Sequence, residues 1–112
     1  MKRGFIRLSE LERGSVLAVL RKNLAVLQEK HMDIPRQRKI ADFHNQLLVL
    51  PRQCRLVGSF YEWAPSDRRF LLRELNEGRN RLLLENGCVE DINNVMEKLD
   101  QMHCRRISEV AL

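Results

Sequence analysis

The chain has 112 residues, which suffice for one domain with a hydrophobic core and are too few for two. Hydrophobic residues make up 44% and charged residues 31% of it, a balance that excludes a disordered chain, and the longest apolar runs are too short to span a membrane. The net charge is +5, yet residues 82–112 carry six acidic against three basic groups. A basic body with an acidic tail indicates an anionic partner, either a nucleic acid or an acidic protein surface; a well-solvated surface without a partner is the alternative.

The cysteines and the first eight residues indicate in which cellular compartment the protein resides. Three cysteines without a close pair predict a reducing intracellular compartment, in which they serve as small buried hydrophobic residues: Cys54, Cys88 and Cys104. Residues 1–8 mix basic and apolar side chains as organelle-targeting peptides do, but Glu10 and Glu12 follow at once, and such peptides avoid acidic residues. The mitochondrial matrix and the cytoplasm both stay open.

Hydrophobic residues recur at helical spacing and predict an all-α fold, a four- to five-helix bundle in a single helical domain over residues 1–112. The first expected helix covers about residues 9–31. It begins either at Ser9, which has a capping-box spacing to Glu12, or at Ser15, because Gly14 weakens the first turns. One face carries the apolar stripe: Val16, Leu17, Leu20, Leu24 and Leu27.

The second expected helix covers about residues 36–50. Asp33 can cap it, Pro35 is tolerated in its first turn, and Pro51 ends it. Its buried face is predicted to hold Ile40, Phe43, Leu47 and Leu50.

Residues 51–65 form an irregular, aromatic-rich segment. We expect a short helix or turn over residues 53–57, followed by a loop that carries Phe60, Tyr61 and Trp63. These rings either plug one end of the bundle, which we favour, or form an exposed anchor for a partner.

The last two expected helices cover about residues 67–86 and 89–109. Asn86 and Gly87 separate them, with Gly87 suited to the left-handed position that ends a helix. So short a link makes the pair an antiparallel helical hairpin. Gly78 lies inside the third helix, where a glycine allows close approach of another helix or of a ligand.

No residue pattern indicates catalysis or metal binding. His31, His44 and His103 lack the paired spacing of metal ligands, and the chain has no Gly-rich phosphate loop. Carboxylates gather only in the last helix, where they are typical of a solvated face. We therefore expect no enzyme activity, no cofactor and no metal.

Two groups of basic residues are the candidate contacts, because arginine binds phosphates and carboxylates through paired donors. The first group is assigned to a protein partner: Arg21, Lys22, Arg36, Arg38 and Lys39. The second group suits RNA or an acidic protein surface equally: Arg68, Arg69, Arg73, Arg79 and Arg81. Aromatic residues do not alternate with them, which disfavours sequence-specific recognition of RNA and leaves shape-based docking open.

The first helix resembles that of the LYR-motif proteins, small three-helix mitochondrial assembly factors and accessory subunits. Residues 16–21, VLAVLR, follow the opening pattern of that family, with Leu20 in the place of Tyr and Arg21 retained, and Phe43 stands at a plausible distance downstream. The resemblance covers about residues 15–45. It implies an adaptor that binds acyl carrier protein, whose acyl chain enters the helical bundle and whose acidic residues face the first basic group.

A second resemblance is to the ribosomal uL29-type helical hairpin, carried by GRNRLLLENG and the periodic helix after it. Both resemblances point away from catalysis. We therefore expect a non-enzymatic adaptor or accessory subunit of a larger assembly, in which a basic surface docks an acidic protein partner. The alternative is a structural RNA-binding subunit of a ribonucleoprotein.

Overall fold

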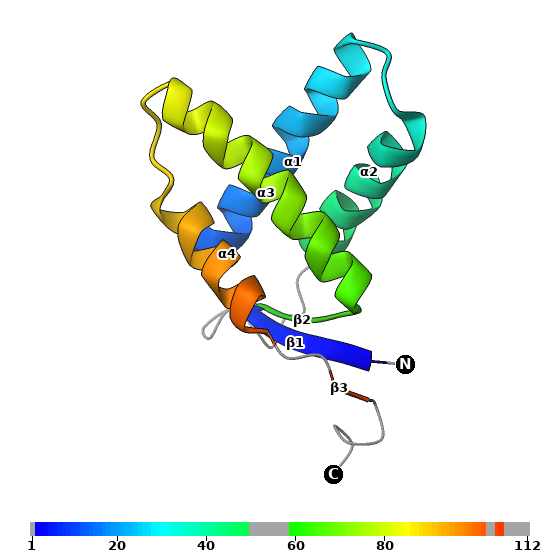
Figure 1. Cartoon of the computed structure of the whole chain (residues 1–112), viewed down its shortest axis with the longest axis vertical. Coiled ribbons are helices and arrows are strands. Elements are labelled where there is room, and N and C mark those ends of the chain that lie inside the picture. Colours follow the sequence, from blue (N-terminus) through cyan, green and yellow to red (C-terminus); the bar gives the residue numbers. More distant parts are fainter. Residues whose placement is uncertain (1, 50–58, 103–104, 107–112) are drawn as a thin grey trace.

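The computed structural model describes residues 2–49, 59–102 and 105–106, and in these ranges the chain forms four helices and a small sheet (Figure 1). The elements in chain order are β1 (Lys2–Leu8), α1 (Glu10–Glu29), α2 (Ile34–Leu48), β2 (Ser59–Trp63), α3 (Pro65–Leu84), α4 (Glu90–Gln101) and β3 (Arg105–Arg106). The mostly helical character is confirmed. The sequence patterns did not predict the small sheet, in which β1 pairs with strands from the middle and the end of the chain.

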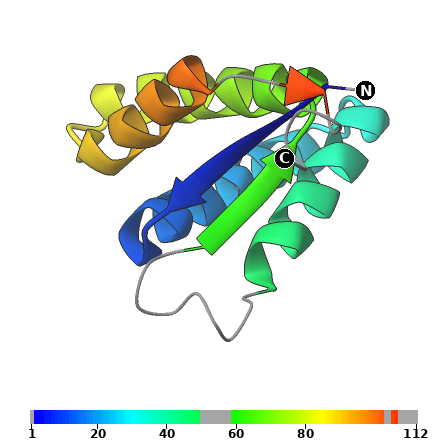
Figure 2. The same cartoon turned by 90° about the horizontal axis from the view of Figure 1, so that it is seen from below.

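The sheet is antiparallel in the order β2-β1-β3 and lies across one end of the helices (Figure 2). Gly4 lies opposite Trp63, and Leu8 lies opposite Ser59. Alternate residues of β1 and β2 point into the core, since a strand turns successive side chains to opposite faces. The buried residues of the two strands are Ile6, Leu8, Tyr61 and Trp63.

The segment 51–65, expected to be irregular, therefore contains a strand at 59–63, and the turn expected at 53–57 lies outside the described residues. Tyr61 and Trp63 stack with ring centroids 5.3 Å apart, and the Trp63 ring lies 5.9 Å from that of Phe43. Because both side chains are buried, they pack against the helices and cannot serve as an exposed anchor.

Helix α1 is the centre of the helical layer and contacts α2, α3 and α4. Its first turn is closed by Ser9, whose Oγ accepts a hydrogen bond from the Glu12 N–H, while Glu12 accepts one from the Ser9 N–H. Ser9 is thus the cap and Ser15 is not. The apolar stripe is buried as predicted at Val16, Leu17, Leu20 and Leu27, and partly so at Leu24.

Two non-glycine residues with left-handed backbone make the turn between α1 and α2. His31 and Asp33 both have φ of 52°, and the Asp33 carboxylate accepts a hydrogen bond from the Arg36 N–H at 3.2 Å. Asp33 caps α2 as predicted, although the helix begins at Ile34 instead of 36. Leu50 lies outside the described residues.

The link between α3 and α4 corrects the expectation for Gly87. Asn86, not Gly87, has the positive φ of 57°, while the Gly87 N–H donates to the Leu82 carbonyl at 2.7 Å.

Helix α4 ends at Gln101 and does not continue to 109. The Arg68 guanidinium donates to the carbonyls of Leu99 and Asp100, groups that a continuing helix would use itself. Beyond this point Arg105 and Arg106 pair with β1 as strand β3.

Candidate functional site

A cleft of about 430 Å3 opens between α1, the end of α3 and the start of α4. Ligand pockets in proteins fall in this size range and are lined mainly by apolar side chains with a few polar groups. The lining residues are Ser15, Ala18, Val19, Lys22, Arg81, Leu82, Glu85, Cys88 and Ile92.

The floor of the cleft is apolar and follows from the close crossing of α1 and α3. Val19 and Ile92 are buried, and Leu82 is partly buried. At the crossing Gly78 faces Val19 so closely that a Cβ atom on Gly78 would overlap the Val19 side chain. Gly78 therefore has the packing role predicted for it, and it lets α3 lie directly on α1.

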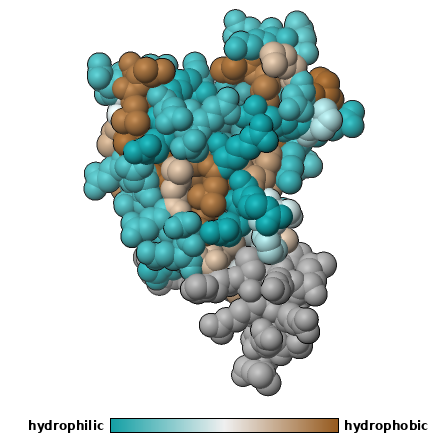
Figure 3. Space-filling model, viewed as in Figure 1, coloured by the Kyte–Doolittle hydropathy of each residue, from teal (hydrophilic) through white to brown (hydrophobic). Residues whose placement is uncertain are grey.

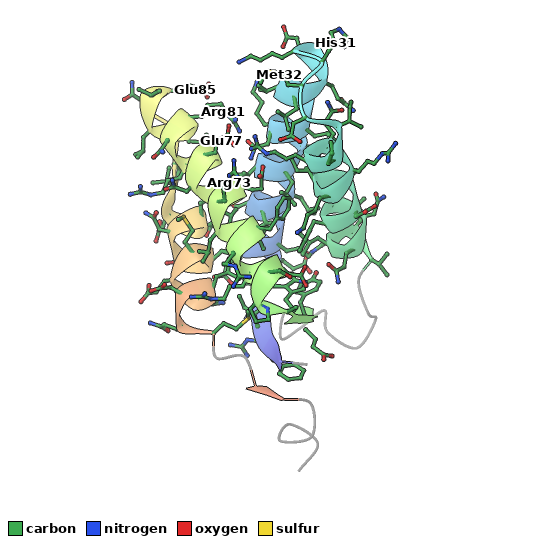
Figure 4. The ribbon with its side chains drawn as sticks, turned by 45° about the vertical axis from the view of Figure 1, so that its right-hand side comes forward. His31, Met32, Arg73, Glu77, Arg81 and Glu85 are labelled. Atoms are coloured by element: carbon green, nitrogen blue, oxygen red, sulfur yellow. The ribbon has the colours of Figure 1, made fainter. Side chains whose placement is uncertain are left out.

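Two basic side chains stand at the rim of the cleft, Lys22 from α1 and Arg81 from α3. Among the described residues, neither has a hydrogen-bond or ion-pair partner. Figure 4 shows Arg81 in a row with Arg73, Glu77 and Glu85 along α3. The cleft thus combines an apolar floor with two cations from different helices and one carboxylate, Glu85, which forms no ion pair with either cation among the described residues.

Arg36 is partly buried and binds two carboxylates of α3. Its Nε donates to Glu74 Oε2 and its Nη2 donates to Glu74 Oε1, both at 2.9 Å, and Nη2 also binds Glu77. These hydrogen bonds, that to Glu74 foremost, raise the pKa of Arg36 against the opposing effect of burial. Arg36, predicted to contact a partner, thus uses its charge within the chain to compensate the buried Glu74 carboxylate.

Asn23 on α1 also belongs to this buried network. Its Nδ2 donates to the Glu74 carbonyl oxygen and to Oε1, both at 3.1 Å, and its exposed fraction is 2%. The network joins α1, α2 and α3. The sequence carries one hint of it, since Glu74 falls on the inner stripe of α3 between Leu71 and Gly78.

Four more of the predicted contact residues have partners within the chain. Arg21 donates to His44 Nε2 at 3.2 Å; burial and this neighbouring charge together lower the pKa of His44. Lys39 lies 4.7 Å from the centre of the Phe70 ring. Arg68 binds the end of α4, and Arg79 donates to Asn93 Oδ1 at 2.6 Å.

Arg38, Arg69 and Arg73 are exposed and have no side-chain partner among the described residues. Arg38 is on α2, whereas Arg69 and Arg73 are one turn apart on α3. Figure 3 shows that the face in front of α3 is mainly hydrophilic, with hydrophobic patches near the upper helix ends. The five residues expected to form one partner surface are therefore divided, with only Lys22 at the cleft.

A second buried carboxylate holds α1, α4 and β1 together. Lys98 Nζ donates to Glu12 Oε1 at 2.6 Å and to the Arg7 carbonyl at 3.0 Å. Burial alone would raise the pKa of Glu12, but the hydrogen bonds from Lys98 and from the Ser9 N–H outweigh it and lower that pKa. This pair fixes α4 against the first half of α1.

Reactive and metal-ligating groups do not converge in the part of the chain that the structure describes. No three His, Cys, Asp or Glu side chains gather there as metal ligands would. Cys88 is exposed at the cleft, against the expectation of a buried thiol, while Cys54, Cys104 and His103 lie outside the described residues. Among the described helices, none has the length and apolarity required to cross a bilayer.

Comparison of the chain with protein-family models, with curated proteins and with solved structures finds no match in any of the three.

Proposed function

We propose that this protein is a non-enzymatic adaptor or accessory subunit, which docks an acidic protein partner at the cleft between α1, α3 and α4. The observation that carries the proposal is the state of Lys22 and Arg81. Five of the other predicted basic contacts bind groups within the chain, whereas Lys22 and Arg81 stand at one cleft without a partner among the described residues.

An apolar floor beside unpaired cations suits a protein partner better than a phosphate backbone. The buried centre of a protein interface excludes water and takes up an apolar side chain, while charges at its rim steer the partner. Val19, Leu82 and Ile92 offer such a centre, and Lys22 and Arg81 such a rim. The LYR-motif resemblance makes acyl carrier protein one acidic candidate.

Copurification from the source cells tests the proposal. The tagged protein is isolated with and without nuclease treatment, and the bound proteins are quantified by mass spectrometry. We expect an acidic protein in stoichiometric amount that survives the nuclease. Loss of all bound protein after nuclease treatment would contradict the proposal.

A structural RNA-binding role is the second candidate, supported by Arg69 and Arg73, which are exposed on α3 and have no partner in the part of the chain that the structure describes. Binding to RNA releases counterions, so the logarithm of the affinity would fall linearly with the logarithm of the salt concentration. A steep slope that becomes shallower in Arg69→Gln and Arg73→Gln would favour this role over the first.

A further inference from the structure

Helix α1 is longer than the helix that covers one of its sides. Helix α4 has 12 residues against 20 in α1. Its contacts reach the first half of α1, where Lys98 binds Glu12 and the Ser15 hydroxyl lies 3.5 Å from the Asp91 carboxylate. Figure 1 shows α4 beside the lower half of α1 only.

The uncovered side of α1 continues from the cleft as one face. Ala18, Lys22, Ala25 and Glu29 are all exposed and follow one another at helical spacing. From Ala18 to Glu29 the face is about 16 Å long, or three turns of helix. Two alanines on it let a neighbouring helix approach closely, since packed helices lie about 8–10 Å apart and small side chains favour the shorter distance.

Charge restricts what can occupy this face. Within residues 2–49, 59–102 and 105–106, Lys22 and Arg81 have no partner at the cleft, so an occupant needs carboxylates there. Glu85 follows Arg81 by one turn of α3 and Glu29 follows Lys22 by two turns of α1, and both are exposed. Glu85 itself lines the cleft, so the carboxylates of the occupant must lie against Lys22 and Arg81; beyond the cleft Glu29 would repel acidic groups, and the occupant must be acidic near one end only.

We propose that an amphipathic acidic helix of the partner protein packs along α1 beyond the end of α4. One of its apolar side chains enters the cleft against Val19, Leu82 and Ile92, and its carboxylates pair with Lys22 and Arg81. This mode of binding lays the apolar face of a helix into a groove, with anchors at i, i+3 or i+4 and i+7. The inference rests on the proposed function and names the form of the partner segment.

A helix-biased library of 15-residue peptides, selected by display on the full chain, tests the inference. We expect the enriched peptides to carry a net negative charge and apolar anchors at i, i+3 or i+4 and i+7. Fluorescence anisotropy then measures their affinity for the variants. The affinity for the peptides should fall about tenfold or more in the double variant Lys22→Glu with Arg81→Glu, because loss of a desolvated charge pair at an interface weakens binding.

Ala25→Trp separates this inference from the proposed function, because Ala25 lies on the open face of α1 but does not line the cleft. The matched control is Asn45→Trp, which places the same ring at an exposed position of α2. We expect Ala25→Trp to abolish peptide binding and Asn45→Trp to preserve it, with unchanged melting temperatures for both.

Three results would overturn the inference. The first is a selection that enriches no peptide, or enriches basic or extended ones. The second is a natural partner that is lost in Lys22→Glu with Arg81→Glu yet retained in Ala25→Trp; the proposed function would then stand without a helix on α1. The third is a homodimer in sedimentation that Ala25→Trp dissociates, because a second copy of the chain would then occupy the face.

Discussion

Arg36 on α2 and Glu74 on α3 form two parallel hydrogen bonds of 2.9 Å, with the Glu74 side chain fully buried. Removal of one partner from such a pair leaves an uncompensated charge in the interior, at a cost of about 3–5 kcal/mol. We expect Arg36→Ala, which leaves the buried Glu74 carboxylate without its guanidinium, to lower the free energy of unfolding by about this amount, as measured by urea denaturation.

Glu77 supplies the control, because it binds the same Arg36 from an exposed position. Exposed ion pairs contribute about 0–1 kcal/mol, so Glu77→Ala should cost far less than Arg36→Ala. Equal costs for the two variants would show that Arg36 does not compensate a buried Glu74 carboxylate.

The close crossing of α1 and α3 predicts that an alanine in place of Gly78 destabilises the protein. Alanine favours a helix over glycine by about 1 kcal/mol, yet Gly78→Ala should destabilise the protein by about 1–3 kcal/mol through overlap with Val19. Gly14→Ala is the control, since a Cβ atom there meets nothing within 4 Å, and it should stabilise. In a double-mutant cycle, Val19→Ala with Gly78→Ala should cost less than the sum of the single variants. Additive costs would show that the helices do not touch at this point.

The lowered pKa of Glu12 predicts a pH dependence of stability. A carboxylate whose pKa is lower in the folded than in the unfolded state stabilises the protein above its unfolded pKa of about 4.3, and this stabilisation is lost as the pH falls through the folded pKa. Lys98→Met removes the charge that binds Glu12. We expect the loss of unfolding free energy between about pH 6 and pH 3 to be smaller in Lys98→Met than in the wild type. An identical loss in both proteins would mean that Lys98 does not lower this pKa.

The helices were predictable because the signals for them are local. Ser9 with Glu12, Asp33 and the apolar stripes lie within a few residues of the structure they specify. The sheet joins residues far apart in the chain, as in the pairing of Gly4 with Trp63. The local sequence signal for it is short, since only Ile6 and Leu8 alternate with exposed neighbours in β1.

The candidate site was predictable only in part, because charge in a sequence does not reveal its partner. Lys22 and Arg36 look alike in the sequence, yet Lys22 has no partner among the described residues at the cleft, while Arg36 binds a buried carboxylate of α3, far along the chain. Likewise, Arg68 on α3 binds a carbonyl at the end of α4. The helical spacing of apolar residues in the sequence continues past Gln101 and does not reveal this end.

The central claim is that Lys22 and Arg81 dock an acidic partner protein, and native mass spectrometry of complexes purified from the source cells tests it most directly. The double variant Lys22→Glu with Arg81→Glu is compared with Arg38→Glu with Arg69→Glu. Both reverse two exposed or half-exposed charges and change the net charge equally. We predict that the partner disappears from the first complex only, while both variants keep the wild-type melting temperature. A partner that is retained in the first variant, or lost equally from both, would contradict the claim.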